Sequence, residues 1–367
     1  TNFLTERKKD VLIATIIPAT ESAYKQFVND NRRNIWVKDG DKLKQVSVPI
    51  YTEMTLIDKN GQEVIKITNG EIAAKSRLIN VSVPANTMYK SKTCFASAKA
   101  LNKGDVHVSH VTGWYVNRSE FEKGKRFNGV IRFATPLYGR EGLQGVVQLA
   151  LDYRHLAAYT DHVIPTQSNP VFEADASTGN YAYMVDNRGI MISHPNDYHI
   201  GGLYPDGNPV PPLTEQTSAA MMKKGEEVLN LNLMGFIDPN LPLIAKDAAT
   251  GKSGIKTYKF GGHTKFVAYA PIKFFSHDYP SPAGFGWIGM GVDVEKFNEI
   301  ATKATQNIQK EAKAWSTTII LILVISIVLL FAIAGLLSRG ITRSIEAEVP
   351  ADARGEGPFY DDEEEDK

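Results

Sequence analysis

The sequence predicts an α+β protein that has a long N-terminal stalk helix, antiparallel sheets and a C-terminal transmembrane helix. Three features point to this class. A charged segment with recurring apolar residues opens the chain, which is typical of an amphipathic helix. Short β-branched runs separated by turn residues follow it and indicate antiparallel strands. Ser316 to Leu337 then form an uncharged stretch of 22 residues. A length of 367 residues is enough for two folded domains and these additions.

The composition excludes several classes of protein. With 41 Lys and Arg residues against 41 Asp and Glu residues, the chain gives no electrostatic reason to expect a nucleic-acid partner. Its single cysteine, Cys94, excludes an intramolecular disulfide and a cysteine-rich metal site. The Gly-x-Ser-x-Gly, His-Glu-x-x-His and Walker A motifs do not occur. We therefore expect neither an enzymatic activity nor a cofactor.

The stalk helix is predicted over residues 1–37. Its apolar residues recur among charged ones, at Leu4, Val11, Ile16, Ala23, Phe27 and Trp36. Pro18 interrupts this run and is expected to kink the helix, because its ring removes one backbone hydrogen bond.

Two hairpins are predicted in the first half of the chain. Tyr51 to Thr68 reads as two strands joined at Asn60-Gly61, a pair that supplies the positive φ of a tight turn. Gly129 to Asp152 reads as a second hairpin that turns between Gly139 and Gly142. Strands of this kind beside a few helices indicate an antiparallel α+β domain.

The same pattern recurs in the second half. Tyr181 to Pro195 repeats the strand, Asp-x-x-Gly turn and strand of the first hairpin. Residues 265–274 and 284–297 then parallel the second hairpin, and Asp293 stands where Asp152 closes the earlier strand. Two elements that recur in order at similar spacing predict a duplicated module.

The uncharged stretch 316–337 is predicted to cross a membrane, because about 20 apolar residues in a helix span the hydrocarbon core. Lysines precede it and arginines follow it, so the positive charges do not decide its orientation. More than 300 residues precede it, and we expect this large part outside the cytoplasm. The last residues, 347–367, are rich in acidic side chains and predict a disordered tail.

This order of a stalk helix, two antiparallel modules, closing strands that end in Asp and a membrane helix resembles the double Cache (dCache) sensor family of bacterial transmembrane receptors, whose modules are PAS-like. SRGITRSIE, at 338–346, resembles the opening of a HAMP linker. The resemblance implies a division into stalk helix 1–37, membrane-distal module 38–162, membrane-proximal module 163–296, juxtamembrane helix 297–315, transmembrane helix 316–337, HAMP-like linker 338–346 and acidic tail 347–367.

The resemblance also implies a function. The chain would sense a small molecule outside the cytoplasm, as a homodimer in the inner membrane, and pass the signal through its transmembrane helix to an output domain that this chain does not contain. The alternative is a membrane-anchored structural or protein-interaction ectodomain that binds no small molecule.

Four residues of the distal module are candidates for the ligand site. In the family a closing Asp grips a ligand ammonium, and Asp152 occupies that position, although it could equally cap the following helix. The family's Arg-x-Trp-Tyr element is absent, and Trp114 and Tyr115 are its nearest match; either could instead fill the core. Arg132 interrupts an apolar strand and could hold a carboxylate or face solvent. The expected ligand is an organic acid, an amine or another metabolite.

The histidines and the cysteine are interpreted as structural. His107 and His110 lie three positions apart, so they would point to opposite faces of a strand. His194 and His199 lie in a loop with no obvious carboxylate partner. We expect no metal site, and we expect Cys94 to pack as a small apolar residue.

Overall fold

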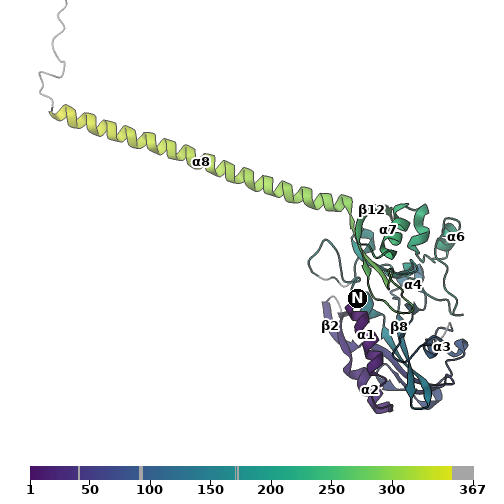
Figure 1. Cartoon of the computed structure of the whole chain (residues 1–367). Coiled ribbons are helices and arrows are strands. Elements are labelled where there is room, and N and C mark those ends of the chain that lie inside the picture. The colour runs from purple at the N-terminus through teal and green to yellow at the C-terminus, as the bar shows by residue number, and fades with distance from the viewer. Residues whose placement is uncertain (40–41, 91–93, 170, 172, 349–367) are drawn as a thin grey trace, which may run out of the picture. The chain divides into compact units, whose positions relative to one another are not determined.

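A computed structural model describes residues 1–39, 42–90, 94–169, 171 and 173–348 of the chain. The chain divides into two units, Thr1–Phe297 and Asn298–Lys367, and each is described by itself (Figure 1). The first unit holds all of the strands found among the described residues, and the described part of the second unit is helical.

The N-terminal segment forms two short helices instead of one stalk helix over residues 1–37. α1 (Asn2–Ile13) ends before Pro18, and α2 (Glu21–Asp30) begins after Thr20, whose side chain accepts a hydrogen bond from the Ala23 N–H. Pro18 offers no N–H to a continuing helix, and the Thr20 cap starts a new one, so the chain breaks here rather than bending.

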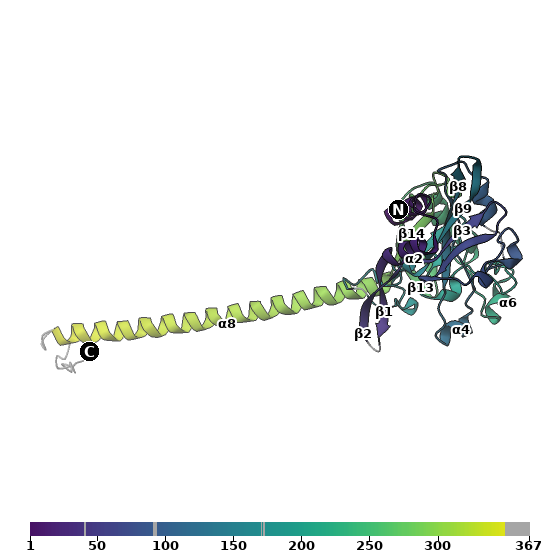
Figure 2. The ribbon, with the colours of Figure 1, turned by 90° about the horizontal axis from the view of Figure 1, so that it is seen from below.

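The last part of the predicted stalk is a strand. β1 (Arg32–Asp39) pairs antiparallel with β2 (Lys42–Pro49), and Trp36 lies opposite Gln45 in this two-stranded sheet (Figure 2). Trp36 therefore belongs to a hairpin, because residues 32–39 form backbone hydrogen bonds with the strand at residues 42–49.

The first sheet confirms both hairpins predicted in the first half of the chain. β3 (Tyr51–Asp58) and β4 (Glu63–Thr68) are joined by a turn in which Gly61 has φ +89°, and β8 (Gly129–Gly139) pairs with β9 (Gly142–Asp152). The strand order is β5-β4-β3-β9-β8-β6, and β7 also pairs with β8. The short strands are β5 (Glu71–Ile72), β6 (His107–Val108) and β7 (Thr112–Gly113).

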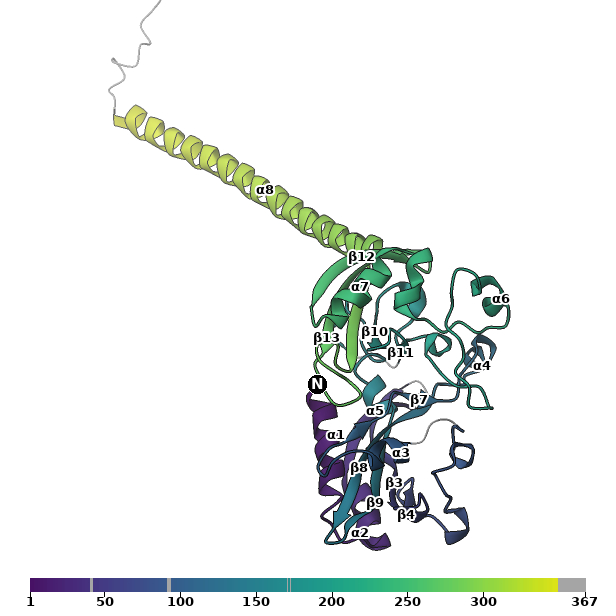
Figure 3. The same cartoon turned by 45° about the vertical axis from the view of Figure 1, so that its right-hand side comes forward.

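The two faces of the first sheet differ. α1 and α2 pack on one face over a core that includes Met54, Ile131, Phe133 and Leu149. α3 (Cys94–Lys99) covers part of the other face, against β8 and β9 (Figure 3). That second face carries the polar pocket described below.

The second sheet confirms the strands predicted in the second half. It consists of β10 (Tyr181–Asp186), β11 (Met191–Ser193), β12 (Gly254–Phe260), β13 (His263–Ile272) and β14 (Gly286–Asp293), in the order β11-β10-β14-β13-β12. α7 (Asn240–Ala249) packs against β12, β13 and β14. The order β4-β3-β9-β8 of the first sheet and the order β11-β10-β14-β13 of the second correspond strand for strand.

The remaining elements of the first unit are short. The α-helices are α4 (Arg118–Glu122), α5 (Arg154–Ala157) and α6 (Ser218–Lys223). The 3₁₀ helices are η1 (Lys75–Arg77), η2 (Pro84–Asn86), η3 (Ala176–Thr178), η4 (Asp197–His199) and η5 (Leu231–Phe236).

Hydrogen bonds join the two halves of the first unit, mainly through residues 107–127. The Tyr115 hydroxyl donates to the Tyr198 carbonyl (2.9 Å) and accepts from the Glu227 N–H (2.8 Å). The Arg118 guanidinium pairs with the buried Glu227 carboxylate at 2.8 Å. A segment that precedes β8 in the chain is thus bonded into the second half of the unit.

α8 (Val294–Glu348) is a single helix of 55 residues, about 80 Å long at 1.5 Å per residue. Its segment Ala301–Ile345 is long and apolar enough to cross a membrane. The predicted run of helix from residue 297 through 337 is therefore continuous, and it extends through 338–346. The acidic tail predicted at 347–367 lies, from residue 349 onward, outside the described residues.

Candidate functional site

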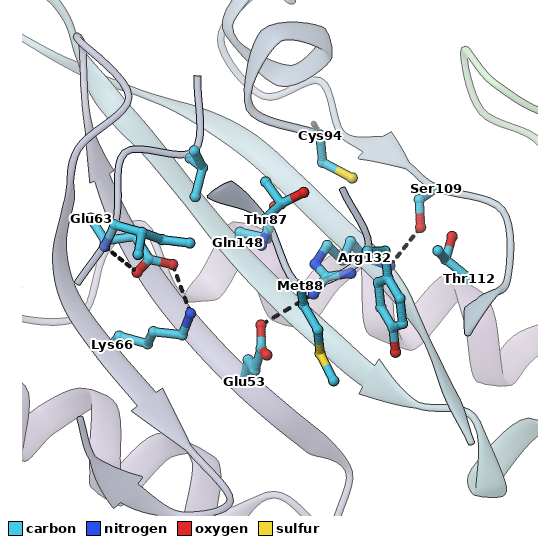
Figure 4. A pocket seen from close by; sticks show the side chains of 13 residues that line it. Glu53, Glu63, Lys66, Thr87, Met88, Cys94, Ser109, Thr112, Arg132 and Gln148 are labelled. Carbon is cyan, nitrogen blue, oxygen red and sulfur yellow. Dashed lines mark hydrogen bonds and ion pairs between the residues drawn. The ribbon is translucent and has the colours of Figure 1, made fainter. Parts of the chain in front are cut away.

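A polar pocket lies on the face of the first sheet that α1 and α2 leave uncovered. Its floor is formed by side chains from four neighbouring strands, β4, β3, β9 and β8, and residues 79–89 close it from above (Figure 4). The cavity has a volume of about 90 Å³. Its lining residues are Glu53, Glu63, Lys66, Ile79, Val81, Thr87, Met88, Tyr89, Cys94, Ser109, Thr112, Arg132 and Gln148.

Arg132 is the predicted site residue that lines this pocket. Its guanidinium lies 3.3 Å from the Glu53 carboxylate, and both side chains are 15% exposed. Burial disfavours the charge on Arg132, but the Glu53 carboxylate, together with Cys94 and Tyr89, holds the pKa of Arg132 above its ordinary value. Its backbone N–H donates to the Ser109 hydroxyl at 2.9 Å, which fixes the strand on that side. The pocket therefore holds a charged guanidinium that is mostly shielded from water.

A second ion pair lies at the other end of the pocket. The Lys66 ammonium donates to the Glu63 carboxylate at 2.9 Å, and the other Glu63 oxygen accepts from the Ile79 N–H at 3.1 Å. Both residues come from β4, while Ile79 belongs to the segment that closes the pocket. Glu63 thus ties this covering segment to the sheet.

Aromatic and neutral polar groups complete the wall. The Arg132 guanidinium lies 5.6 Å from the centre of the Tyr89 ring, and burial raises the pKa of the Tyr89 hydroxyl. The Gln148 amide and the Thr112 hydroxyl also line the cavity. The pocket contains two carboxylates and two cationic side chains, so its formal charge is balanced, and it can meet both a positive and a negative group of one small molecule.

The other three predicted site residues do not line this pocket. Trp114 contacts it indirectly, because its ring packs edge-on against Tyr89 with 5.1 Å between ring centres. Tyr115 points into the core of the second half, where its hydroxyl hydrogen-bonds to the backbone of Tyr198 and Glu227. Asp152 is buried, and its carboxylate is held by the Arg154 guanidinium at 2.6 Å and by the Arg154 N–H at 2.9 Å. These contacts tie Asp152 to Arg154, while the N-cap residue of α5 is Tyr153 and no described side chain caps that helix.

Glu53, Glu63 and Lys66 line the pocket but were not among the residues predicted for the site. Glu53 precedes the core residue Met54 in β3, so the two side chains point to opposite sides of the sheet. Glu63 and Lys66 lie in the partner strand β4. Glu53 and Lys66 were the available signal, as charged residues on one side of two paired strands whose other side is apolar. Glu63 lies three positions from Lys66, beyond an irregularity in the register, so alternation alone would not have placed it on that side.

The histidines lie in separate environments. His107 Nδ1 is 2.9 Å from an Asp278 oxygen; burial opposes the positive charge, but hydrogen bonds to Asp278 and Cys94 raise the pKa of His107 to about 9. His110 Nε2 contacts the Asn187 side chain at 3.0 Å. His194 and His199 are both buried, with 4.8 Å between ring centres. Among the described residues, no group of three or more His, Cys, Asp or Glu side chains is arranged to hold a metal ion.

The second half contains one glycine pattern that resembles a cofactor-binding motif. Gly284, Gly286 and Gly289 have the spacing of a dinucleotide-binding loop. Gly284 precedes β14, while Gly286 and Gly289 lie within it, and Gly286 pairs with Ile272 of β13. None of the three lies at a turn from a strand into a helix. The pattern therefore indicates no cofactor site.

Comparison with known proteins gives only structural similarities. No protein-family model and no curated protein matches the chain. The extracellular domain of the histidine kinase vpHK1S-Z8 is similar over 69% of this chain and 72% of its own, with 16% identity and a TM-score of 0.42. The ligand-binding domain of the Pseudomonas fluorescens chemoreceptor CtaA, in complex with L-leucine, is similar over 80% of this chain and 88% of its own, with 15% identity and a TM-score of 0.41.

A third similar structure is the ligand-binding domain of the Pseudomonas aeruginosa PAO1 amino acid chemoreceptor PctB in complex with L-Arg. It covers 80% of this chain and 89% of its own, with 13% identity and a TM-score of 0.40. These similar structures are extracellular or ligand-binding domains of sensor kinases and chemoreceptors.

Proposed function

We propose that this chain is the extracytoplasmic sensor region of a bacterial membrane receptor of the double Cache type. It binds a small organic acid, amine or zwitterionic metabolite in the first-sheet pocket and passes the signal through α8. The observation that carries this proposal is the shielded Glu53–Arg132 pair, which lines a polar cavity of about 90 Å³. Burying two charges is expensive, and a ligand of both signs can engage them without leaving either unpaired.

Two further features support the sensor architecture. The corresponding strand orders of the two sheets are what a duplicated PAS-like module would produce. α8 is continuous from the last strand through the segment able to cross a membrane, which would make it a rigid single-pass link to an output domain. In this proposal the receptor is a homodimer in the inner membrane, with its α8 helices side by side.

The experiment uses the full chain purified in detergent. Carboxylic acids, amines and amino acids are screened by thermal shift, and each hit is measured by titration calorimetry. A ligand at 100 times its dissociation constant should stabilise the protein by about 2.7 kcal/mol. The variant Arg132→Gln should weaken binding by about tenfold or more, because it removes a charge-assisted hydrogen bond.

The matched control is Arg126→Gln. Arg126 also forms an ion pair, with Glu173 at 2.9 Å, but it lies outside the pocket lining and is more exposed. This control should bind like the wild type. If no compound binds, the chain is better described as a structural or protein-interaction ectodomain. If every compound that binds the wild type also binds Arg132→Gln with unchanged affinity, the first-sheet pocket is not the ligand site.

A further inference from the structure

A second cavity lies in the other half of the first unit, against the second sheet. Its volume is about 450 Å³, and its lining includes Lys265, His194, His199, Tyr181, Tyr198 and Phe260. We call it the second-sheet cavity. It shares no lining residue with the first-sheet pocket.

Lys265 is the unusual residue of this cavity. Lys265 lies on β13, two and four positions before Val267 and Tyr269, whose side chains face the core. Because alternate residues of a strand point to the same side, the Lys265 side chain also points inward. The residue is 1% exposed, and its ammonium has no hydrogen-bond partner among the described residues. The nitrogen lies 3.3 Å from the centre of the Tyr181 ring. The face of an aromatic ring attracts a cation, but it does not replace the oxygen acceptors that the three N–H groups of an ammonium require.

His194 supplies a second unpartnered donor. Its Nδ1 accepts a hydrogen bond from the Asn196 N–H at 2.9 Å, which assigns the ring proton to Nε2. The residue is 2% exposed, and Nε2 has no partner in the part of the chain that the structure describes. The ring packs against Tyr181 with 4.8 Å between centres, so His194 and Lys265 border the same aromatic side chain.

The other charges around the cavity are already compensated. Arg118 pairs with Glu227 at 2.8 Å, and the His263 ring hydrogen-bonds the Asp293 carboxylate. Asp175 lies at the exposed rim, where it accepts from the Ser177 N–H. One buried ammonium and one buried N–H donor therefore border the same Tyr181 ring, in a cavity whose other walls are partly polar and partly aromatic or aliphatic.

We propose that the second-sheet cavity binds a small organic monoanion, whose carboxylate accepts hydrogen bonds from the Lys265 ammonium and from His194 Nε2–H. The apolar body of the ligand would pack on Tyr181, Tyr198 and Phe260. A single negative charge fits, because among the described lining residues only Lys265 is a cation without an anionic partner in hydrogen-bond contact. A second negative charge would meet Glu227 and Asp175. Burial holds the pKa of Lys265 at about 7, and an anion beside it would restore the charged form.

The test uses the full chain in detergent at constant ionic strength. Benzoate and butyrate are compared with benzamide and butyramide, which have the same shapes without the charge. The carboxylates should raise the Tm and the amides should not. Equilibrium dialysis with labelled benzoate should give one binding site per chain. Equal effects of acids and amides would overturn the proposal, and so would the absence of benzoate binding.

Variants assign the binding to this cavity. Lys265→Met should weaken benzoate binding about 10- to 100-fold, and His194→Leu about tenfold, as expected for the loss of hydrogen bonds to a charged group. Lys259→Met, an exposed lysine of the neighbouring strand β12, should bind like the wild type. Arg132→Gln should also bind benzoate normally, since Arg132 belongs to the first-sheet pocket. Wild-type affinity in both Lys265→Met and His194→Leu would overturn the proposal, whatever the first-sheet pocket binds.

Discussion

Replacing Lys265 by methionine should stabilise the protein, and the gain should depend on pH in a defined way. The side chain is 1% exposed and its ammonium has no hydrogen-bond partner among the described residues, so the fold bears the cost of a buried charge. Methionine keeps the length of the chain and most of its contacts but carries no charge.

The size of the effect follows from the pKa. Burial lowers the pKa of Lys265 from an ordinary value of 10.5 to about 7, although the nearby Asp293 carboxylate opposes this change. At 1.36 kcal/mol per pH unit, the difference corresponds to a cost of at most about 5 kcal/mol.

The sign is set by proton binding. Below about pH 7 both the folded and the unfolded states bind the proton, and the full cost is present. Between about pH 7 and 10.5 only the unfolded lysine stays protonated, so the stability of the wild type rises with pH. The advantage of Lys265→Met should therefore shrink in this range and vanish above it.

The assay is urea unfolding of the full chain in detergent, followed by tryptophan fluorescence from pH 6 to pH 9. The stability difference between Lys265→Met and the wild type should fall by about 3 kcal/mol across this range. The exposed control Lys259→Met should show a small difference that does not change with pH. A pH-independent difference for Lys265→Met, or a wild type more stable than the variant at pH 6, would refute the reasoning.

Three further outcomes are expected. Tyr115→Phe should lower the free energy of unfolding by about 1–2 kcal/mol in urea, because a buried N–H loses its acceptor; unchanged stability would show that this bond contributes nothing. Asp152→Asn should cost about 1–2 kcal/mol by weakening its bonds to Arg154, while ligand binding in the first-sheet pocket should stay as in the wild type; a selective loss of binding would instead support a ligand role. Single cysteines placed along 301–314 in a Cys94→Ser chain should cross-link in membranes with a period of about 3.6 residues, whereas uniformly absent cross-linking would indicate that α8 is only an anchor.

The parts of the fold that sequence could predict are those with local determinants. The turn at Gly61 was predictable because Asn-Gly tolerates positive φ, and the structure gives this glycine φ +89°. The membrane segment was predictable from an uncharged run alone. Trp36 was misplaced in a helix, because a few apolar residues among charged ones fit a helix until the pairing partner of the strand, residues 42–49, is considered.

The site was only partly predictable, because its partners come from distant parts of the chain. Arg132 was identified as a charged residue in an apolar strand, but its partner Glu53 lies 79 residues away on β3, with β9 between the two strands. Asp152 was correctly placed at the end of a strand, yet nothing in its neighbourhood distinguishes a ligand contact from the bond to Arg154 that the structure contains. Lys265 could have been noticed, because it is a charged residue that alternates with the apolar side chains of Val267 and Tyr269 on the same side of one strand.

The bonds between residues 107–127 and the second half of the unit limit how hybrid receptors can be made. Exchanging residues 38–162 alone for a foreign sequence would remove the Tyr115 hydroxyl, which donates to the Tyr198 carbonyl. It would also remove Arg118, the ion-pair partner of the buried Glu227 carboxylate. The smallest part that can be transplanted intact is therefore Thr1–Phe297. A fusion to a foreign signalling domain should be joined within α8, where the number of residues inserted or deleted at the junction sets the rotation of the downstream part by about 100° per residue.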